Sequence, residues 1–223
     1  MKNKILLICA HPDDETLGCG GLINSLSNKY EIFLSIFSDG VSARENTSKK
    51  DITQRIEHFY DATQELGVLR KNIFQFDFRD NCFDTYEIMT FSKKIERLIK
   101  DINPSTIFTH CDNDLNQDHL VLNNATKIAT RSNNKIKNIL FFETPSSTEL
   151  NLKNIFTPNF FYKINEKNFK KKINALKKYK KEIRDFPHPR SCEYIDALSK
   201  FRGSQIGFKR AEAFEAYKIT DIL

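Results

Sequence analysis

The sequence is poor in the residues that usually separate folding units, with six prolines and seven glycines among 223 residues. No stretch rich in proline, glycine and serine is typical of a linker, and no segment repeats. No hydrophobic run approaches the length of a membrane-spanning helix. These absences argue against a transmembrane protein and against linked domains. They favour one domain over residues 1–223, with a C-terminal extension packed on it from about residue 151.

Several chemical motifs are also missing. The five cysteines form no C-x-x-C pair and no even disulfide framework, so the cytoplasm is the expected compartment. No G-x-S-x-G motif is present, which argues against a serine or cysteine hydrolase. Gly18, Gly20 and Gly21 do not complete G-x-G-x-x-G, because Ile23 occupies the last position. A dinucleotide site is therefore not expected.

The net charge of +6 is concentrated in one segment, because Lys163 to Arg184 carries an excess of eight positive charges. Apolar residues recur there at helical spacing, which predicts an amphipathic helix with lysines on its solvated face. Attraction to an anionic membrane surface or to a phosphate-bearing substrate is the weaker alternative. No motif typical of nucleic-acid binding accompanies the charge, so no nucleic-acid partner is expected. The apolar residues of this helix are Phe169, Ile173, Leu176, Tyr179 and Ile183.

The most informative stretch is the acidic motif Ala10-His-Pro-Asp-Asp-Glu15, which follows the apolar run Ile5 to Cys9. That run predicts a strand buried on both faces, with the motif at its carboxyl end, where open α/β sheets bind ligands. In a tight turn, His11 and Asp14 can face one side and hold a metal, which leaves Asp13 free as a general base. Helix capping by Asp13 or Asp14 is an equal alternative on these residues alone.

A second cluster follows the predicted strand that ends at Thr109. It runs from His110 to His119, where a helix is expected to begin. Catalytic zinc normally has three protein ligands, so a third is needed from another strand end. Of the five histidines, His119 is the best candidate. Asp118 beside it is a candidate for a supporting contact behind the ligands.

The sequence at this point resembles the PIG-L/LmbE family of metal-dependent de-N-acetylases, whose members carry an AHPDDE motif and a later Asp-His. The resemblance also covers later blocks that are individually weak, which are Arg55 to Gly67, Asp112 to His119, Glu143 to Thr148, His188 to Ser191 and Arg202 to Phe214. It implies that His11, Asp14 and His119 hold zinc, with Fe²⁺ as an alternative ion. It also implies that Asp13 takes a proton from the metal-bound water.

The chain departs from the family pattern at one position. Many relatives have a histidine three residues before the ligand histidine, as a partner for the oxyanion, whereas this chain has Asn116. An asparagine amide donates a hydrogen bond but supplies no proton. His110 is the other candidate for that catalytic role, with a buried structural histidine as its equal alternative.

The remaining candidates are substrate contacts. Arg55, on a predicted helix, and Arg44, in the loop before it, are both able to reach the site, and the resemblance favours Arg55. Asp80 follows a predicted strand and is a candidate for binding sugar hydroxyls. The resemblance also places the stretch containing His188 and Arg190 near the substrate, with a surface loop as the alternative.

The hydrophobic pattern predicts alternating strands and helices, and hence a Rossmann-like, mostly parallel sheet with helices on both faces. The expected strands are 5–9, 31–37, 72–78, 107–109 and 137–142, and the expected helices are 16–27, 51–66, 85–102, one from about 119, and 191–201.

We therefore expect a zinc-dependent hydrolase that removes the acetyl group from an N-acetylated sugar, which is free or linked to a nucleotide, phosphate or lipid. One alternative is an amidase that cleaves a larger amide such as a thiol-glycoside conjugate. Another is a non-catalytic module that binds a sugar or nucleotide. The sequence leaves the exact sugar and the oligomeric state open.

Overall fold

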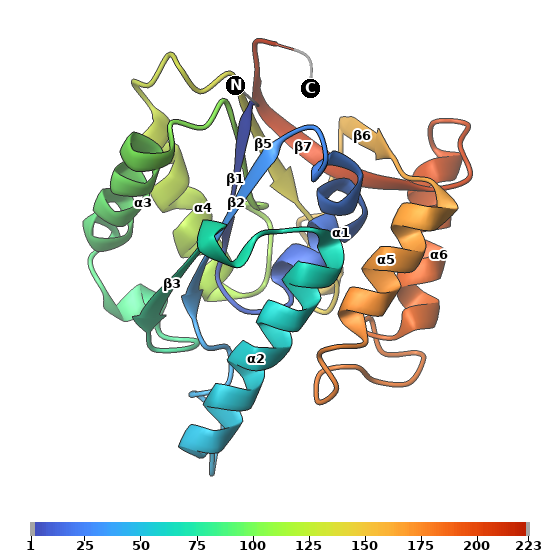
Figure 1. The fold of residues 1–223 in the computed structure, drawn as a ribbon, viewed down its shortest axis with the longest axis horizontal. Helices are drawn as coiled ribbons and strands as arrows, with labels where there is room; N and C mark the ends of the chain where they lie inside the picture. Colours follow the sequence, from blue (N-terminus) through green and yellow to red (C-terminus); the bar gives the residue numbers. More distant parts are fainter. Residues whose placement is uncertain (1–2, 222–223) are drawn as a thin grey trace.

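The structure, a computed structural model, describes residues 3–221 and contains a seven-stranded sheet in the order β3-β2-β1-β4-β5-β7-β6 (Figure 1). The first five strands in this order are parallel, whereas β7 is antiparallel to both β5 and β6. This confirms the predicted Rossmann-like, mostly parallel sheet. The strands are β1 (Lys4–Cys9), β2 (Glu31–Ser38), β3 (Ile73–Phe78), β4 (Thr106–His110), β5 (Asn138–Phe142), β6 (Phe160–Lys163) and β7 (Ala211–Ile219).

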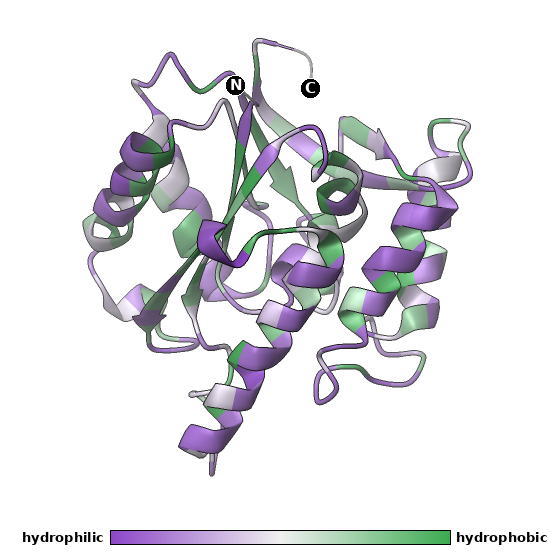
Figure 2. Cartoon of the chain, in the orientation of Figure 1, coloured by the Kyte–Doolittle hydropathy of each residue, from purple (hydrophilic) through white to green (hydrophobic). Residues whose placement is uncertain are grey.

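Helices cover both faces of the sheet. On one face, α3 and α4 contribute Phe91, Ile95 and Leu122 to a core with alternate strand residues. On the other face, α1, α2 and α5 form a second core, and hydrophobic residues line the strands between the two layers (Figure 2). None of the helices in residues 3–221 is long and apolar enough to cross a membrane. The helices are α1 (Asp14–Leu26), α2 (Lys49–Leu66), α3 (Ile88–Ile102), α4 (Gln117–Thr130), α5 (Glu166–Leu176) and α6 (Cys192–Ser204).

The strand order places the acidic motif at the centre of one rim. Strand β1 pairs in parallel with both β2 and β4, so the loops that follow these three strands meet at their carboxyl ends. The chain reverses its direction of winding between β1 and β4, which is the position where open α/β sheets form their ligand crevice. The loop after β5 lies at the same rim, because β5 is parallel to β4.

The C-terminal part differs from expectation in two ways. The predicted lysine-rich helix ends at Leu176, and the chain then turns so that Tyr179 is fully buried. The prediction that one helix continues through Ile183 was therefore wrong. Tyr179 is buried by contacts with Glu15 and Arg55, which are distant in sequence, and not by its position on a helix. The structure also adds strands β6 and β7, and β7 pairs directly with β5.

The glycines of α1 permit close packing. A Cβ atom on Gly18 would lie 2.5 Å from the Phe142 ring at the end of β5. A Cβ atom on Gly21 would lie 2.8 Å from Ile164 and 3.2 Å from a carboxylate oxygen of Glu212. Helix α1 thus touches both the parallel sheet and the C-terminal segment at positions where no side chain fits.

Candidate active site

The acidic motif forms a tight left-handed turn between β1 and α1. Asp13 has φ 95°, a conformation rarely adopted by residues with a side chain, and its carbonyl oxygen accepts hydrogen bonds from Thr16 and Leu17. Its side chain makes no capping bond, and an Asp14 oxygen instead accepts the His11 amide at 2.8 Å. The turn therefore separates the two aspartates and places Asp14 beside His11. Non-glycine residues in this conformation are found mainly where function requires them.

Three side chains bring one ligand atom each to the same point. His119 Nε2 lies 3.3 Å from His11 Nδ1, and an Asp14 oxygen lies 3.6 Å from each of these nitrogens. Two ligands of one tetrahedral zinc ion, each about 2.0–2.2 Å from it, are about 3.3–3.6 Å apart. The spacing of the three donor atoms therefore fits one small divalent cation, and the two imidazoles and one carboxylate are a common catalytic zinc set.

Carboxylates support His11 from behind. His11 Nε2 lies 3.0 Å from Asp118 and 3.1 Å from Asp80, so a proton on Nε2 leaves the Nδ1 lone pair for a metal. The backbone amides of Asn81 and Phe83 donate to the Asp118 carboxylate and fix it in place. The structure thus places Asp118 where a supporting contact was predicted. It places Asp80, which was predicted to bind sugar hydroxyls, against His11 with 2% of its surface exposed.

His119 has a similar support that sequence reasoning missed. An Asp114 oxygen lies 3.2 Å from His119 Nδ1, and the Ser147 and Thr148 hydroxyls from the loop after β5 donate to the Asp114 carboxylate. Although burial alone would raise it, His119 and these hydrogen bonds lower the pKa of Asp114 to about 2. A carboxylate four residues after the β4 strand was the only signal in the sequence for this contact.

His110 lies behind the cluster. Its ring stacks on His119 at a centroid distance of 3.8 Å, and its Nε2 accepts the Ala10 amide at 3.0 Å. Burial, followed by the neighbouring His119, lowers the pKa of His110 to about 4. Asn116, the other candidate oxyanion partner, is the N-cap of α4, where its side-chain oxygen accepts the Asp118 amide.

The electrostatics of the cluster favour a cation at its centre. Burial alone would lower the pKa of His11, yet the carboxylates of Asp118, Asp14 and Asp80 raise it well above its usual value. In the same way, burial alone would raise the pKa of Asp14, but His119 and His110 lower it. Without a metal, protonated His11 supplies positive charge that the surrounding carboxylates require.

Asp13 has an arginine partner from α2. Arg55 Nη2 lies 2.9 Å from an Asp13 oxygen and donates to the Pro12 carbonyl, and both side chains are buried. Arg190 approaches the same Asp13 oxygen at 3.4 Å. Burial alone would lower the pKa of Arg55, but Asp13 and Glu182 raise it, so the guanidinium remains charged.

Glu182 lies against three arginines at the edge of the site, and the sequence analysis did not predict these contacts. Its carboxylate lies 2.9 Å from Arg44, 3.0 Å from Arg190 and 3.7 Å from Arg55. His188 is exposed, and its Nδ1 accepts the Arg190 amide at 3.0 Å. The structure therefore brings Arg44, Arg55 and Arg190 together and leaves His188 exposed in the loop that carries Arg190.

Tyr179 is a third contact that the sequence did not reveal. Its hydroxyl donates to Glu15 at 2.6 Å, and its ring lies beneath the Arg55 guanidinium at 5.0 Å. Glu15 in turn accepts the Asp13 backbone amide at 3.1 Å. The C-terminal segment thus supports both the turn that carries Asp13 and the arginine that pairs with it.

Known proteins are similar to this chain in sequence or in fold. The chain is 33% identical over 184 residues to the uncharacterized deacetylase YaiS of Escherichia coli, which covers 80% of this chain and 91% of that protein. The fold matches N,N'-diacetylchitobiose deacetylase from Pyrococcus horikoshii with a TM-score of 0.79 and 20% identity, over 97% of this chain and 84% of that one. It also matches the 4-carboxy-2-hydroxymuconate hydratase GalB from Pseudomonas putida, with a TM-score of 0.76 and 19% identity over the full length of both chains.

The two structural matches carry different activities, so the fold by itself does not determine the reaction. Sequence similarity is more specific. The model of the PIG-L family, described as GlcNAc-PI de-N-acetylase, matches residues 6–130, which include the acidic motif, Arg55, and the segment from His110 to His119. On this match and on the similarity to YaiS, the chain belongs to the PIG-L family of de-N-acetylases.

Proposed function

We propose that the protein is a zinc-dependent hydrolase that removes the acetyl group from an N-acetylated amino sugar. One observation carries the proposal, namely the convergence of His11, Asp14 and His119 donor atoms at 3.3–3.6 Å beside the Asp13 turn. Fe²⁺ is the alternative ion for this set. When bound, the ion supplies the Lewis acidity that makes water a nucleophile at neutral pH.

Asp13 is the general base in this proposal. It takes a proton from the attacking water and delivers it to the sugar nitrogen as the carbon–nitrogen bond breaks, which gives acetate and a free amine. Within residues 3–221, neither Asp13 oxygen has a hydrogen bond of good geometry, and Arg55 supplies the nearby positive charge. The positive charge therefore lies beside Asp13, and no hydrogen bond of good geometry occupies its oxygens.

We assign separate roles to the other predicted residues around the site. We assign the side-chain amide of Asn116 to the oxyanion, and His110 to the positioning of His119, because both His110 nitrogens already have partners. Arg44 and Arg190, whose side chains are 45% and 25% exposed, are the proposed substrate contacts at the mouth. Asp80 is assigned to the support of His11.

The test is acetate release from a panel of N-acetylhexosamines, both free and linked to a nucleotide or lipid phosphate, by zinc-loaded protein. A chelated sample and a His119→Ala variant are the controls. We expect acetate from at least one sugar only when metal is present. No acetate from any member, from protein with one bound ion per chain, would overturn the proposal in favour of a larger amide substrate or a binding role.

A further inference from the structure

Exposed apolar side chains gather on two loops beside the site. Among residues 3–221, the two most exposed large hydrophobic side chains are those of Leu152 and Ile155, at 84% and 74%, in the segment after β5. Leu150 in the same segment and Leu115 in the loop after β4 are also exposed. Single apolar residues scattered over a surface need no explanation, but a contiguous group marks a surface that a partner covers.

Hydrogen bonds tie the two loops together. Asn113 Nδ2 donates to the Asn154 carbonyl at 3.1 Å, and Asn151 Nδ2 donates to the Asn113 carbonyl at 2.8 Å. The loop after β4 is therefore fixed against the segment after β5 at two points. The apolar residues that flank these asparagines in the sequence belong to one surface.

Strand β7 extends this surface on the face of the sheet that carries α3 and α4. The backbone amide of Thr157 donates to Glu215 on β7 at 2.9 Å. Tyr217, farther along β7, is exposed and stacks on Phe141 at a centroid distance of 5.3 Å, and Phe141 belongs to the core under α3 and α4. We use the name apolar patch for five exposed residues, which are Leu115, Leu150, Leu152, Ile155 and Tyr217.

The polar groups of these loops carry almost no exposed charge. The described segments 113–116 and 150–155 contain four asparagines, and Lys153 is their one exposed charged residue, since Asp114 is buried against His119. The centre of a protein interface is depleted in charge and surrounded by hydrogen-bonding groups. Because an amide both donates and accepts, this surface is able to match a second copy of itself.

The cations of the chain are concentrated on the other face of the sheet. The lysine-rich α5 packs there with α1 and α2, whereas Phe156, next to Ile155 in sequence, belongs to the core under α3 and α4 (Figure 1). Apolar side chains that bind an anionic membrane are accompanied by lysines and arginines on the same side. A lipid surface would meet the apolar patch or the lysines of α5, but not both.

We propose that the apolar patch pairs with the same patch on a second copy of this chain, about a two-fold axis. The pairing buries aliphatic side chains and amides without bringing like charges together, whereas the lysine-rich face would repel its own copy. The interface lies beside the candidate active site, because Asp114, which supports His119, immediately precedes Leu115. The inference does not depend on the reaction that the site performs.

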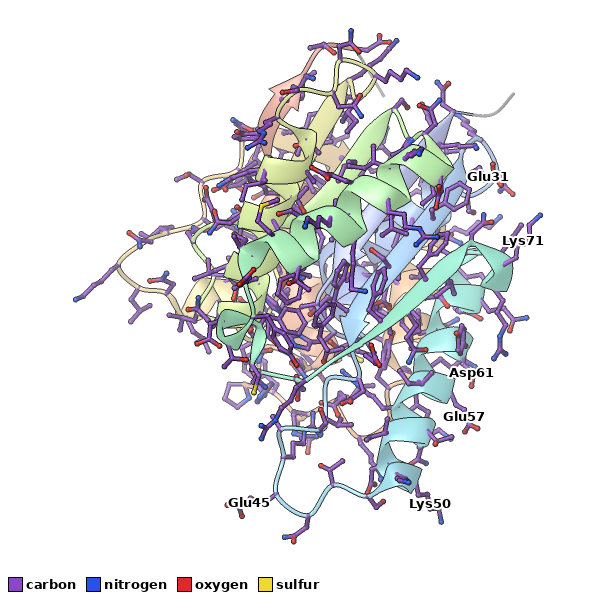
Figure 3. All side chains as sticks on the ribbon, turned by 90° about the vertical axis from the view of Figure 1, so that its left-hand side faces the viewer. Glu31, Glu45, Lys50, Glu57, Asp61 and Lys71 are labelled. Atoms are coloured by element: carbon purple, nitrogen blue, oxygen red, sulfur yellow. The ribbon has the colours of Figure 1, made fainter. Side chains whose placement is uncertain are left out.

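A double variant, Leu152→Asp with Ile155→Asp, tests the pairing. Both side chains are exposed in the single chain, so its core is unchanged, but in the pair the new carboxylates would lie against apolar groups without a partner. Leu152→Ala with Ile155→Ala removes apolar area without adding charge. Leu69→Asp is the matched control, because Leu69 is also exposed and lies two residues before Lys71, on the α2 side of the molecule (Figure 3).

Sedimentation equilibrium measures the mass of each protein at concentrations from about 1 to 100 μM, and thermal unfolding establishes that each variant folds. We expect the wild type and Leu69→Asp to have the mass of two chains, or of a larger even number, with a dissociation constant of about 10 μM or below. The alanine pair should raise that constant about tenfold. The aspartate pair should raise it at least about 100-fold and sediment as a single chain.

Three results would overturn the inference. They are a wild type that remains a single chain at about 100 μM, an assembly with an odd number of chains, and an assembly that persists in the aspartate variant. Cosedimentation with vesicles of phosphatidylcholine and phosphatidylglycerol tests the membrane as the other occupant. We expect the wild type to bind vesicles no better than the aspartate variant does; vesicle binding that only this variant loses, without self-association, would assign the apolar patch to a membrane instead.

Discussion

At the scale of single residues, the site consists of a first layer of donor side chains and a second layer of carboxylates behind them. His11, Asp14 and His119 supply the donor atoms, and Asp118, Asp80 and Asp114 orient the two imidazoles. The first layer was predictable because the motif follows a buried strand and matches a family pattern. The second layer was harder to predict, since Asp114 and Asp80 are ordinary loop aspartates until the fold places them against the histidines.

Asp118→Asn tests the second layer. The change weakens the contact that fixes the His11 tautomer, so we expect zinc affinity to fall about 10- to 100-fold. Competition with a chromogenic chelator measures the dissociation constant. Asp112→Asn is the control, because Asp112 is exposed and pairs with Lys127, away from the histidines. Unchanged affinity in Asp118→Asn would show that His11 needs no support from this carboxylate.

The cysteines give a second test at this scale. Burial raises the pKa of Cys9, Cys19 and Cys111, so these thiols stay protonated at pH 8 and are closed to reagents. Cys82 and Cys192 are partly exposed. Titration with a thiol reagent should therefore detect two reactive thiols in the native protein and five in denaturant. A third fast-reacting thiol in the native protein would contradict the closed packing around the motif.

At the scale of elements, the chain up to β5 and helix α6 followed the sequence closely, whereas the segment between β5 and α6 and the final strand β7 did not. The expected strands and helices up to β5 lie within three residues of those observed, because hydrophobic period and turn residues are local signals. The prediction that the lysines of α5 all lie on its solvated face was wrong for Lys172. Its side chain is buried and lies 2.6 Å from Glu212. Pairing between elements 40 residues apart leaves no local pattern.

The Lys172–Glu212 pair is also a test of how α1 is held. Glu212 accepts the backbone amides of Gly21 and Leu22, and Lys172 donates to the Leu17 carbonyl. Glu212→Ala leaves the buried Lys172 ammonium without its carboxylate partner, so we expect the free energy of unfolding to fall by about 3–5 kcal/mol. Urea titration measures it. Adding Lys172→Met should recover part of the loss; a double variant less stable than Glu212→Ala would contradict this pairing.

At the scale of the whole molecule, the site joins the two halves of the chain. The candidate metal ligands come from the turn after β1 and from the first turns of α1 and α4, and Tyr179, Glu182 and Arg190 of the C-terminal segment contact Asp13, its turn or Arg55. The sequence motifs predicted the site residues that come from the N-terminal part of the chain. The contribution of Tyr179 and Glu182 depends on contacts across more than 120 residues, which no local spacing records.

Metal binding should therefore stabilise the fold as a whole. Zinc at about 100 times its dissociation constant adds about 2.7 kcal/mol to the free energy of unfolding. For a chain of this size, we expect the Tm to rise by about 5–10 °C over a chelated sample in scanning calorimetry. The His119→Ala variant should show no such rise. An equal rise in that variant would place the ion elsewhere.

We propose that His11, Asp14 and His119 bind the metal while Asp13 transfers the proton, and Asp13→Asn tests this most directly. Zinc content and acetate release are measured on the same sample, with the best sugar of the panel as substrate. We expect one zinc per chain and a kcat lower by about 10²- to 10⁴-fold, because the ligands remain while the base is lost. Full activity in Asp13→Asn would remove Asp13 as the base, and loss of the zinc would make it a ligand.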